Sequence, residues 1–92
     1  MIKVKILLWG QLKVNAQTDA IELEVGQPHT VENALFRLVD FMAPLKGMLM
    51  SDEGQLRQSI LVFVNGVQLT WGQDNPLQDG TEITLMSPIA GG

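Results

Sequence analysis

The sequence predicts an α+β domain in which one main helix packs on one face of a mixed sheet of four to five strands. Three observations lead to this expectation. Apolar residues alternate with a period of two near both ends of the chain. A central segment instead has the i, i+3, i+4 spacing of an amphipathic helix. After that segment, Asn65-Gly66 is the strongest short signal for a β-hairpin.

The first half of the chain contains two strand patterns. Residues 2–9 alternate and predict the first strand, which Gly10 interrupts. Residues 20–25 alternate more cleanly and predict the second strand, with its odd-numbered apolar residues facing inward. Proline at position 28 ends that strand, because proline cannot donate a ladder hydrogen bond.

The helix is predicted to begin after Thr30, a favourable N-cap residue. Its apolar stripe consists of Val31, Ala34, Leu35, Leu38, Val39 and Met42. Pro44 then stops the helix. We expect a short second helix over residues 45–50, followed by a polar connection over residues 51–58.

The second half predicts three strands. Residues 60–64 lead into Asn65-Gly66, and residues 67–71 return from this turn. A loop over 72–76 and a tight turn at Asp79-Gly80 precede the last strand, residues 81–86. Residues 87–92 show no regular pattern. We therefore expect one domain, residues 1–86, and a flexible C-terminal tail, residues 87–92.

Composition restricts the class of protein. The 92 residues suffice for one domain, and 46% hydrophobic with 17% charged residues is typical of a globular chain. The formal net charge of −4 disfavours nucleic acid as a partner. No apolar run approaches the roughly 20 residues of a membrane helix, and the N-terminus lacks a signal-peptide core. We expect a cytoplasmic protein without a membrane or nucleic-acid partner.

Side chains that could carry chemistry are few. The absence of cysteine excludes disulfides, thiolate metal sites and cysteine nucleophiles. His29 is the single histidine, and Asp52 and Glu53 lie in the polar connection, where solvation explains them best. No phosphate-binding glycine loop or nucleophile–base pair is recognisable. The chain is therefore not expected to be an enzyme, or to bind a cofactor or metal itself.

The C-terminal tail is open to two interpretations. It could be a frayed end. Alternatively, Gly91 and Gly92 could enter a narrow channel of another protein, where a terminal carboxylate without a neighbouring β-carbon is open to attack. Six residues from Ser87 onward reach about 20 Å when extended.

Four segments in order resemble the ubiquitin-like sulfur carriers of the MoaD/ThiS family, which includes CysO-type carriers. They are IKVKILLWGQL at the N-terminus, TVENALFRLVD in the helix, FVNG at the hairpin and LQDGTEITLMSPIAGG at the C-terminus. The resemblance covers essentially the whole chain and implies a β-grasp fold.

The resemblance also implies a mechanism. An E1-like adenylyltransferase of the MoeB/ThiF type, using ATP and magnesium, would adenylate the carboxylate of Gly92, which follows Gly91. Sulfur would displace AMP and leave a thiocarboxylate. A second enzyme, such as a MoaE-like large subunit of molybdopterin synthase or a cysteine synthase, would then receive the sulfur.

Two departures bear on the pathway. Ser87-Pro88 stands where many MoaD members have two prolines, and the chain is longer than a typical ThiS. We expect a MoaD-like carrier for molybdenum cofactor biosynthesis, as the small subunit of molybdopterin synthase. The alternatives are a CysO-type carrier for cysteine or another sulfur metabolite, a ubiquitin-like protein modifier, and an interaction module whose glycines have no role.

A docking surface is expected at the root of the tail. If Ile83 and Leu85 face the helix, Met86 is exposed, and Leu7 lies beside it because a β-grasp fold pairs the first and last strands. Phe63 joins them if its neighbours pack inward. The expected partner-binding residues are Leu7, Phe63, Met86, Pro88, Ile89 and Ala90. The alternative is that a loop covers this face. Trp9 and Trp71 could belong to the core or to such a surface.

Overall fold

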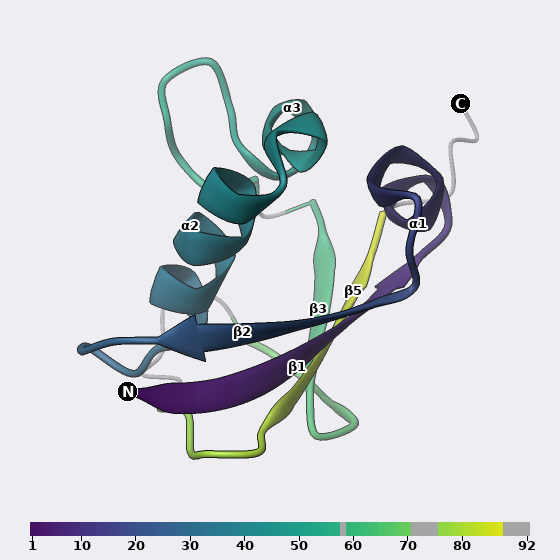
Figure 1. The fold of residues 1–92 in the computed structure, drawn as a ribbon. Helices are drawn as coiled ribbons and strands as arrows, with labels where there is room; N and C mark the ends of the chain where they lie inside the picture. The colour runs from purple at the N-terminus through teal and green to yellow at the C-terminus, as the bar shows by residue number, and fades with distance from the viewer. Residues whose placement is uncertain (58, 71–75, 88–92) are drawn as a thin grey trace.

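The fold is a five-stranded mixed sheet with the main helix packed on one face (Figure 1). The computed structural model describes residues 1–57, 59–70 and 76–87. The elements are β1 (Ile2–Trp9), α1 (Gln11–Ala16), β2 (Ala20–Val25), α2 (Val31–Phe41), a 3-10 turn (Ala43–Leu45), α3 (Lys46–Leu49), β3 (Leu61–Val64), β4 (Val67–Gln68) and β5 (Glu82–Met86). The predicted α+β class with one main helix is confirmed.

The sheet has the strand order β2-β1-β5-β3-β4. β1 pairs antiparallel with β2 and parallel with β5. β5 in turn pairs antiparallel with β3. Because β1 and β5 run in the same direction, their C-terminal ends lie at the same end of the sheet, next to α1 (Figure 1).

The hydrophobic core lies between the sheet and α2. The alternation predicted for β1 and β5 holds, because Val4, Ile6 and Leu8 of β1 and Ile83 and Leu85 of β5 are buried while the residues between them are not. The side chains that contribute most to the core from these elements are Val4, Ile6, Leu8, Leu35, Leu38, Ile83 and Leu85. Burial of a side chain of this size contributes about 1.5–3 kcal/mol, so the core is the main source of stability.

The predicted N-cap of α2 is confirmed. The hydroxyl of Thr30 accepts a hydrogen bond of 3.2 Å from the backbone N–H of Asn33. The Asn33 side-chain amide also donates to the carbonyls of Gly26 and Pro28, which fixes the approach to the helix. α2 ends at Phe41, before Pro44. The predicted short second helix over residues 45–50 is confirmed as α3, and a 3-10 turn precedes it.

The hairpin between β3 and β4 has the predicted type I′ turn. Asn65 and Gly66 both have positive φ, at 50° and 85°. The Asn65 side chain also accepts a hydrogen bond of 2.9 Å from the N–H of Glu82, while its own N–H donates to the Glu82 carbonyl. The turn is thereby attached to β5.

Two elements differ from the sequence prediction. α1 was not predicted, because only Leu12 and Ala16, four residues apart, mark its buried side. The return strand is shorter than the predicted 67–71, since β4 contains two residues. Leu69 turns into the core, although its N–H still donates to Val62. Trp71 lies outside the described residues, as does the predicted tail after Ser87.

None of the helices in the described ranges is both long and apolar enough to cross a bilayer.

Gly10 connects β1 to α1 in a conformation that favours glycine, with φ 64° and ψ −136°. A β-carbon here would lie 3.3 Å from the Ser87 hydroxyl oxygen. We predict that Gly10→Ala lowers the free energy of unfolding by about 1–3 kcal/mol. Gly47→Ala is the matched control, because α3 leaves open space at that position and alanine favours helix. Urea unfolding measures both, and equal effects would contradict the prediction.

Candidate functional site

The candidate site begins where the chain leaves the sheet. β1 and β5 end together, with Trp9 paired to Met86. The residues that follow the two strands are also close to each other, because a β-carbon at Gly10 would lie 3.3 Å from the Ser87 hydroxyl oxygen. Anything attached after Ser87 therefore starts beside the end of β1. The predicted reactive residues Gly91 and Gly92 lie outside the described residues, and so do Pro88, Ile89 and Ala90.

Apolar side chains gather on the outer face of the sheet at this end. Register places Trp9, Met86 and Leu61 in one row across three strands. The adjacent row contains Leu7, Thr84 and Phe63. We call the apolar members of the two rows the outer patch: Leu7, Trp9, Leu61, Phe63 and Met86. The structure thus brings together the three predicted docking residues that it describes.

The outer patch faces away from α2 and is accessible. The Trp9 side chain is 56% exposed and the Leu61 side chain is 40% exposed, while the other three members are half-buried. Exposure of the Trp9 side chain decides between the two interpretations of this residue, because a core tryptophan would be covered. Contiguous apolar residues on a sheet face are typical of a protein-interaction surface.

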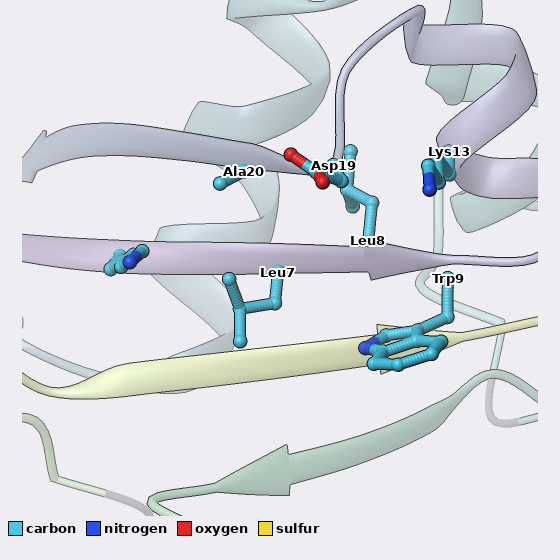
Figure 2. Close-up of a pocket in the computed structure, with 7 residues that line it drawn as sticks. Leu7, Leu8, Trp9, Lys13, Asp19 and Ala20 are labelled. Carbon is cyan, nitrogen blue, oxygen red and sulfur yellow. The ribbon is translucent and has the colours of Figure 1, made fainter.

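A hollow of about 280 Å³ lies at one side of the outer patch (Figure 2). Its lining residues are Lys5, Leu7, Leu8, Trp9, Lys13, Asp19 and Ala20. Figure 2 shows Leu7 and Trp9 projecting from β1 on the same side, with Lys13 of α1 and Asp19 nearby. An apolar surface bordered by charged groups can hold an apolar side chain and orient it by polar contacts.

The arrangement is suited to binding rather than to covalent chemistry by its own side chains. Leucine, phenylalanine, tryptophan and methionine offer contact area, and methionine adapts its shape to a partner. Among the residues that the structure describes, no three His, Asp or Glu side chains are grouped so that they could hold a metal. The predicted absence of a cofactor and a metal remains a prediction.

Sequence reasoning missed Leu61 as a member of the site. Because Val62 faces the core, alternation predicts that the Leu61 side chain faces outward. Alternation does not predict which residue of the adjacent strand lies beside Leu61. Only the pairing of β3 with β5 shows that Leu61 lies opposite Met86.

Comparison with known proteins identifies similar chains. The model of the ThiS family matches residues 6–92. No curated protein sequence matches the chain. A solved structure of the small archaeal modifier protein SAMP1 from Haloferax volcanii is similar, with a TM-score of 0.87 and 28% identity over 98% of this chain and 99% of that chain.

Two further solved structures share the fold at lower identity. A putative molybdopterin converting factor subunit 1 from Pyrococcus furiosus has a TM-score of 0.71 and 19% identity over 97% of this chain and 100% of that chain. A chain of the BexX/CysO complex from Amycolatopsis orientalis has a TM-score of 0.70 and 23% identity over 97% of this chain and 99% of that chain.

The two faces of β5 predict opposite responses to the same substitution. Leu85→Asp would bury a carboxylate without a partner in the core, so we expect the domain to unfold at room temperature. Met86→Asp places the charge on the outer face, so we expect a folded domain that loses about 1 kcal/mol of stability. Thermal unfolding followed by circular dichroism measures both. An unfolded Met86→Asp variant would show that Met86 contributes to folding like a core residue.

Proposed function

This chain belongs to the ThiS family, and we propose that it is a sulfur carrier whose Gly92 carboxylate is adenylated and then converted to a thiocarboxylate. Ubiquitin-like sulfur carriers and modifiers make up this group of small β-grasp proteins. The observation that carries the proposal is the parallel pairing of β1 and β5, which starts the tail beside the outer patch. The family match supports it, because it extends to residue 92.

The proposed chemistry needs two steps. A carboxylate oxygen of Gly92 attacks the α-phosphorus of ATP, and pyrophosphate leaves. A sulfur nucleophile then attacks the acyl carbon, AMP leaves, and a thiocarboxylate remains. Glycine at this position has no β-carbon, so the acyl carbon can be approached from all sides. ATP and magnesium are held by the activating partner, an E1-like adenylyltransferase of the MoeB/ThiF type.

In this proposal the chain supplies the reacting carboxylate and a binding surface, and its partners supply the catalytic groups. The outer patch provides the surface on which a partner can dock while the tail extends toward the reacting groups. An apolar surface of aromatic and methionine side chains provides binding energy without requiring a unique polar arrangement. Both the activating enzyme and the sulfur acceptor can then use one surface in turn.

The acceptor that we propose first is the large, MoaE-like subunit of molybdopterin synthase, with this chain as the small subunit. The resemblance in four sequence segments supports a sulfur carrier of this group, and the chain length favours a MoaD-like or CysO-like carrier over a ThiS-like one. A CysO-type role with a cysteine synthase uses the same thiocarboxylate and is the nearest alternative.

Protein modification is the second candidate function. It is favoured by the likeness to SAMP1, whose name describes a modifier protein, at 28% identity over nearly the full length of both chains. The first step is the same adenylation of Gly92. A lysine amine of a target protein then attacks the acyl carbon, AMP leaves as the acyl–phosphate bond breaks, and an isopeptide bond forms.

The carrier chemistry predicts a defined change in mass. Incubation with the activating enzyme, ATP and sulfide should raise the mass of the chain by the difference between sulfur and oxygen, located at Gly92 by peptide mapping. Deletion of Gly92 should abolish the change, while thermal unfolding of the domain stays the same. Equal modification of the shortened chain would refute the proposed role of Gly92.

The same thiocarboxylated chain separates the candidate acceptors. Transfer of sulfur to a molybdopterin precursor in the presence of the large subunit supports the first. Transfer to an activated serine derivative by a cysteine synthase supports the CysO-type role, and a glycyl-lysine linkage in a cell lysate supports modification.

The docking role predicts a loss of affinity that does not depend on folding. Met86→Asp should weaken binding to the activating enzyme by at least about tenfold, because the carboxylate would be buried in an apolar interface. Val67→Asp is a matched control, since Val67 is a largely exposed apolar residue outside the outer patch. Calorimetric titration measures both variants. An equal loss for the two would indicate an effect of net charge instead of docking.

A further inference from the structure

We propose that the free edge of β2 is a second docking site, which accepts an extended segment of a partner protein as an added strand with basic residues on one face and apolar residues on the other. β2 is an edge strand of the sheet and lies in front of α2 in Figure 1. This site goes beyond sulfur transfer, because it involves neither the tail nor the outer patch.

The backbone of β2 offers hydrogen-bonding groups at this edge. The N–H of Leu8 donates to the carbonyl of Asp19 at 3.0 Å, so that pair is hydrogen-bonded. In an antiparallel ladder such pairs alternate with pairs whose backbone groups point away. Ala20, Glu22 and Glu24 therefore turn their N–H and C=O groups toward the edge.

Thr18 satisfies the outward backbone groups of Ala20 at one end of this edge. The Thr18 hydroxyl donates a hydrogen bond of 3.1 Å to the carbonyl of Ala20. It also accepts a hydrogen bond of 3.4 Å from the N–H of Ala20. The described residues provide no such side chain for the outward backbone groups of Glu22 and Glu24. An incoming strand would pair with these two residues.

A hollow of about 370 Å³ follows the same edge. Its lining residues are Lys3, Glu22, Leu23, Glu24, Arg37 and Phe41. Phe41, in the last turn of α2, is 64% exposed and leaves its apolar ring accessible beside this edge. Added strands are held by backbone hydrogen bonds and selected by pockets for alternate side chains. Leu23 and Phe41 provide the apolar pocket on the α2 side.

On the sheet face that points away from α2, the glutamates of β2 favour an occupant with basic side chains. Register aligns Glu22, Lys5 and Glu82 in one row across three strands, with alternating sign. The row has one negative charge in excess, and a lysine or arginine opposite Glu22 would continue the alternation. In the next row Glu24 lies opposite Lys3, so a second basic residue two positions along the partner strand would face an acid as well.

A second copy of this chain fits the edge poorly. Two β2 strands paired through Glu22 and Glu24 would place glutamates opposite glutamates, and like charges directly opposite each other are destabilising. The favoured occupant is therefore a different protein, with basic and apolar residues in alternation.

A capped heptapeptide of alternating lysine and valine tests the site by NMR titration. We expect its binding to shift and protect the amides of Glu22 and Glu24, and to occur equally with the chain lacking Gly92. The same peptide with glutamate in place of lysine should bind at least about tenfold more weakly. Glu22→Lys should weaken lysine-peptide binding by a similar factor, whereas Glu53→Lys, with the same charge change in the polar connection, should not.

Backbone pairing is separated from simple charge attraction by N-methylation of the lysine residues, which removes the N–H groups that would face β2 if the peptide pairs antiparallel. We expect this peptide to lose binding. Equal binding of the methylated or the glutamate peptide would overturn the proposal, as would no binding of any peptide. Concentration-dependent shifts at Glu22 without peptide would show that the edge pairs with a second copy instead.

Discussion

The parallel pairing of β1 with β5 is the interaction on which the rest of the structure depends. It places Ile6 beside Ile83 and Leu8 beside Leu85 in the middle of the sheet, where these side chains are buried under α2. A shift of the register by one residue would exchange the inner and outer faces of a strand. One register therefore determines the core, the outer patch and the position at which the chain leaves the sheet.

Local patterns in the sequence predicted β1, β2 and α2 with nearly correct bounds, because their apolar periodicity extends over six or more residues. The Thr30 cap and the Asn65-Gly66 turn were predictable for a similar reason, since each depends on the chemistry of adjacent residues. α1 was missed because one turn with two buried residues does not establish a period. Strand neighbours could not be derived from alternation alone, which is why Leu61 entered the outer patch only through its pairing with Met86.

The two surfaces proposed for docking lie on different parts of the sheet. The outer patch occupies the end of β1, β5 and β3 from which the chain leaves the sheet, and it is mostly apolar. The edge of β2 lies on the far side of β1 from β5 and carries two glutamates on the outer face of the sheet. The two surfaces differ in chemistry, so that partners of different character can be recognised by one small domain.

The central pairing also has a consequence for the kinetics of folding. β1 and β5 are separated by most of the described chain, so their contacts close a loop of more than seventy residues. Contacts of high sequence separation cost loop-closure entropy before they contribute stability, and domains that depend on them fold more slowly than helical bundles of equal size. A nascent chain that ends before β5 cannot form this pairing, because one of the two strands is missing. The outer patch therefore forms only after β5 has been synthesised, which couples the appearance of this surface to a segment more than seventy residues after β1.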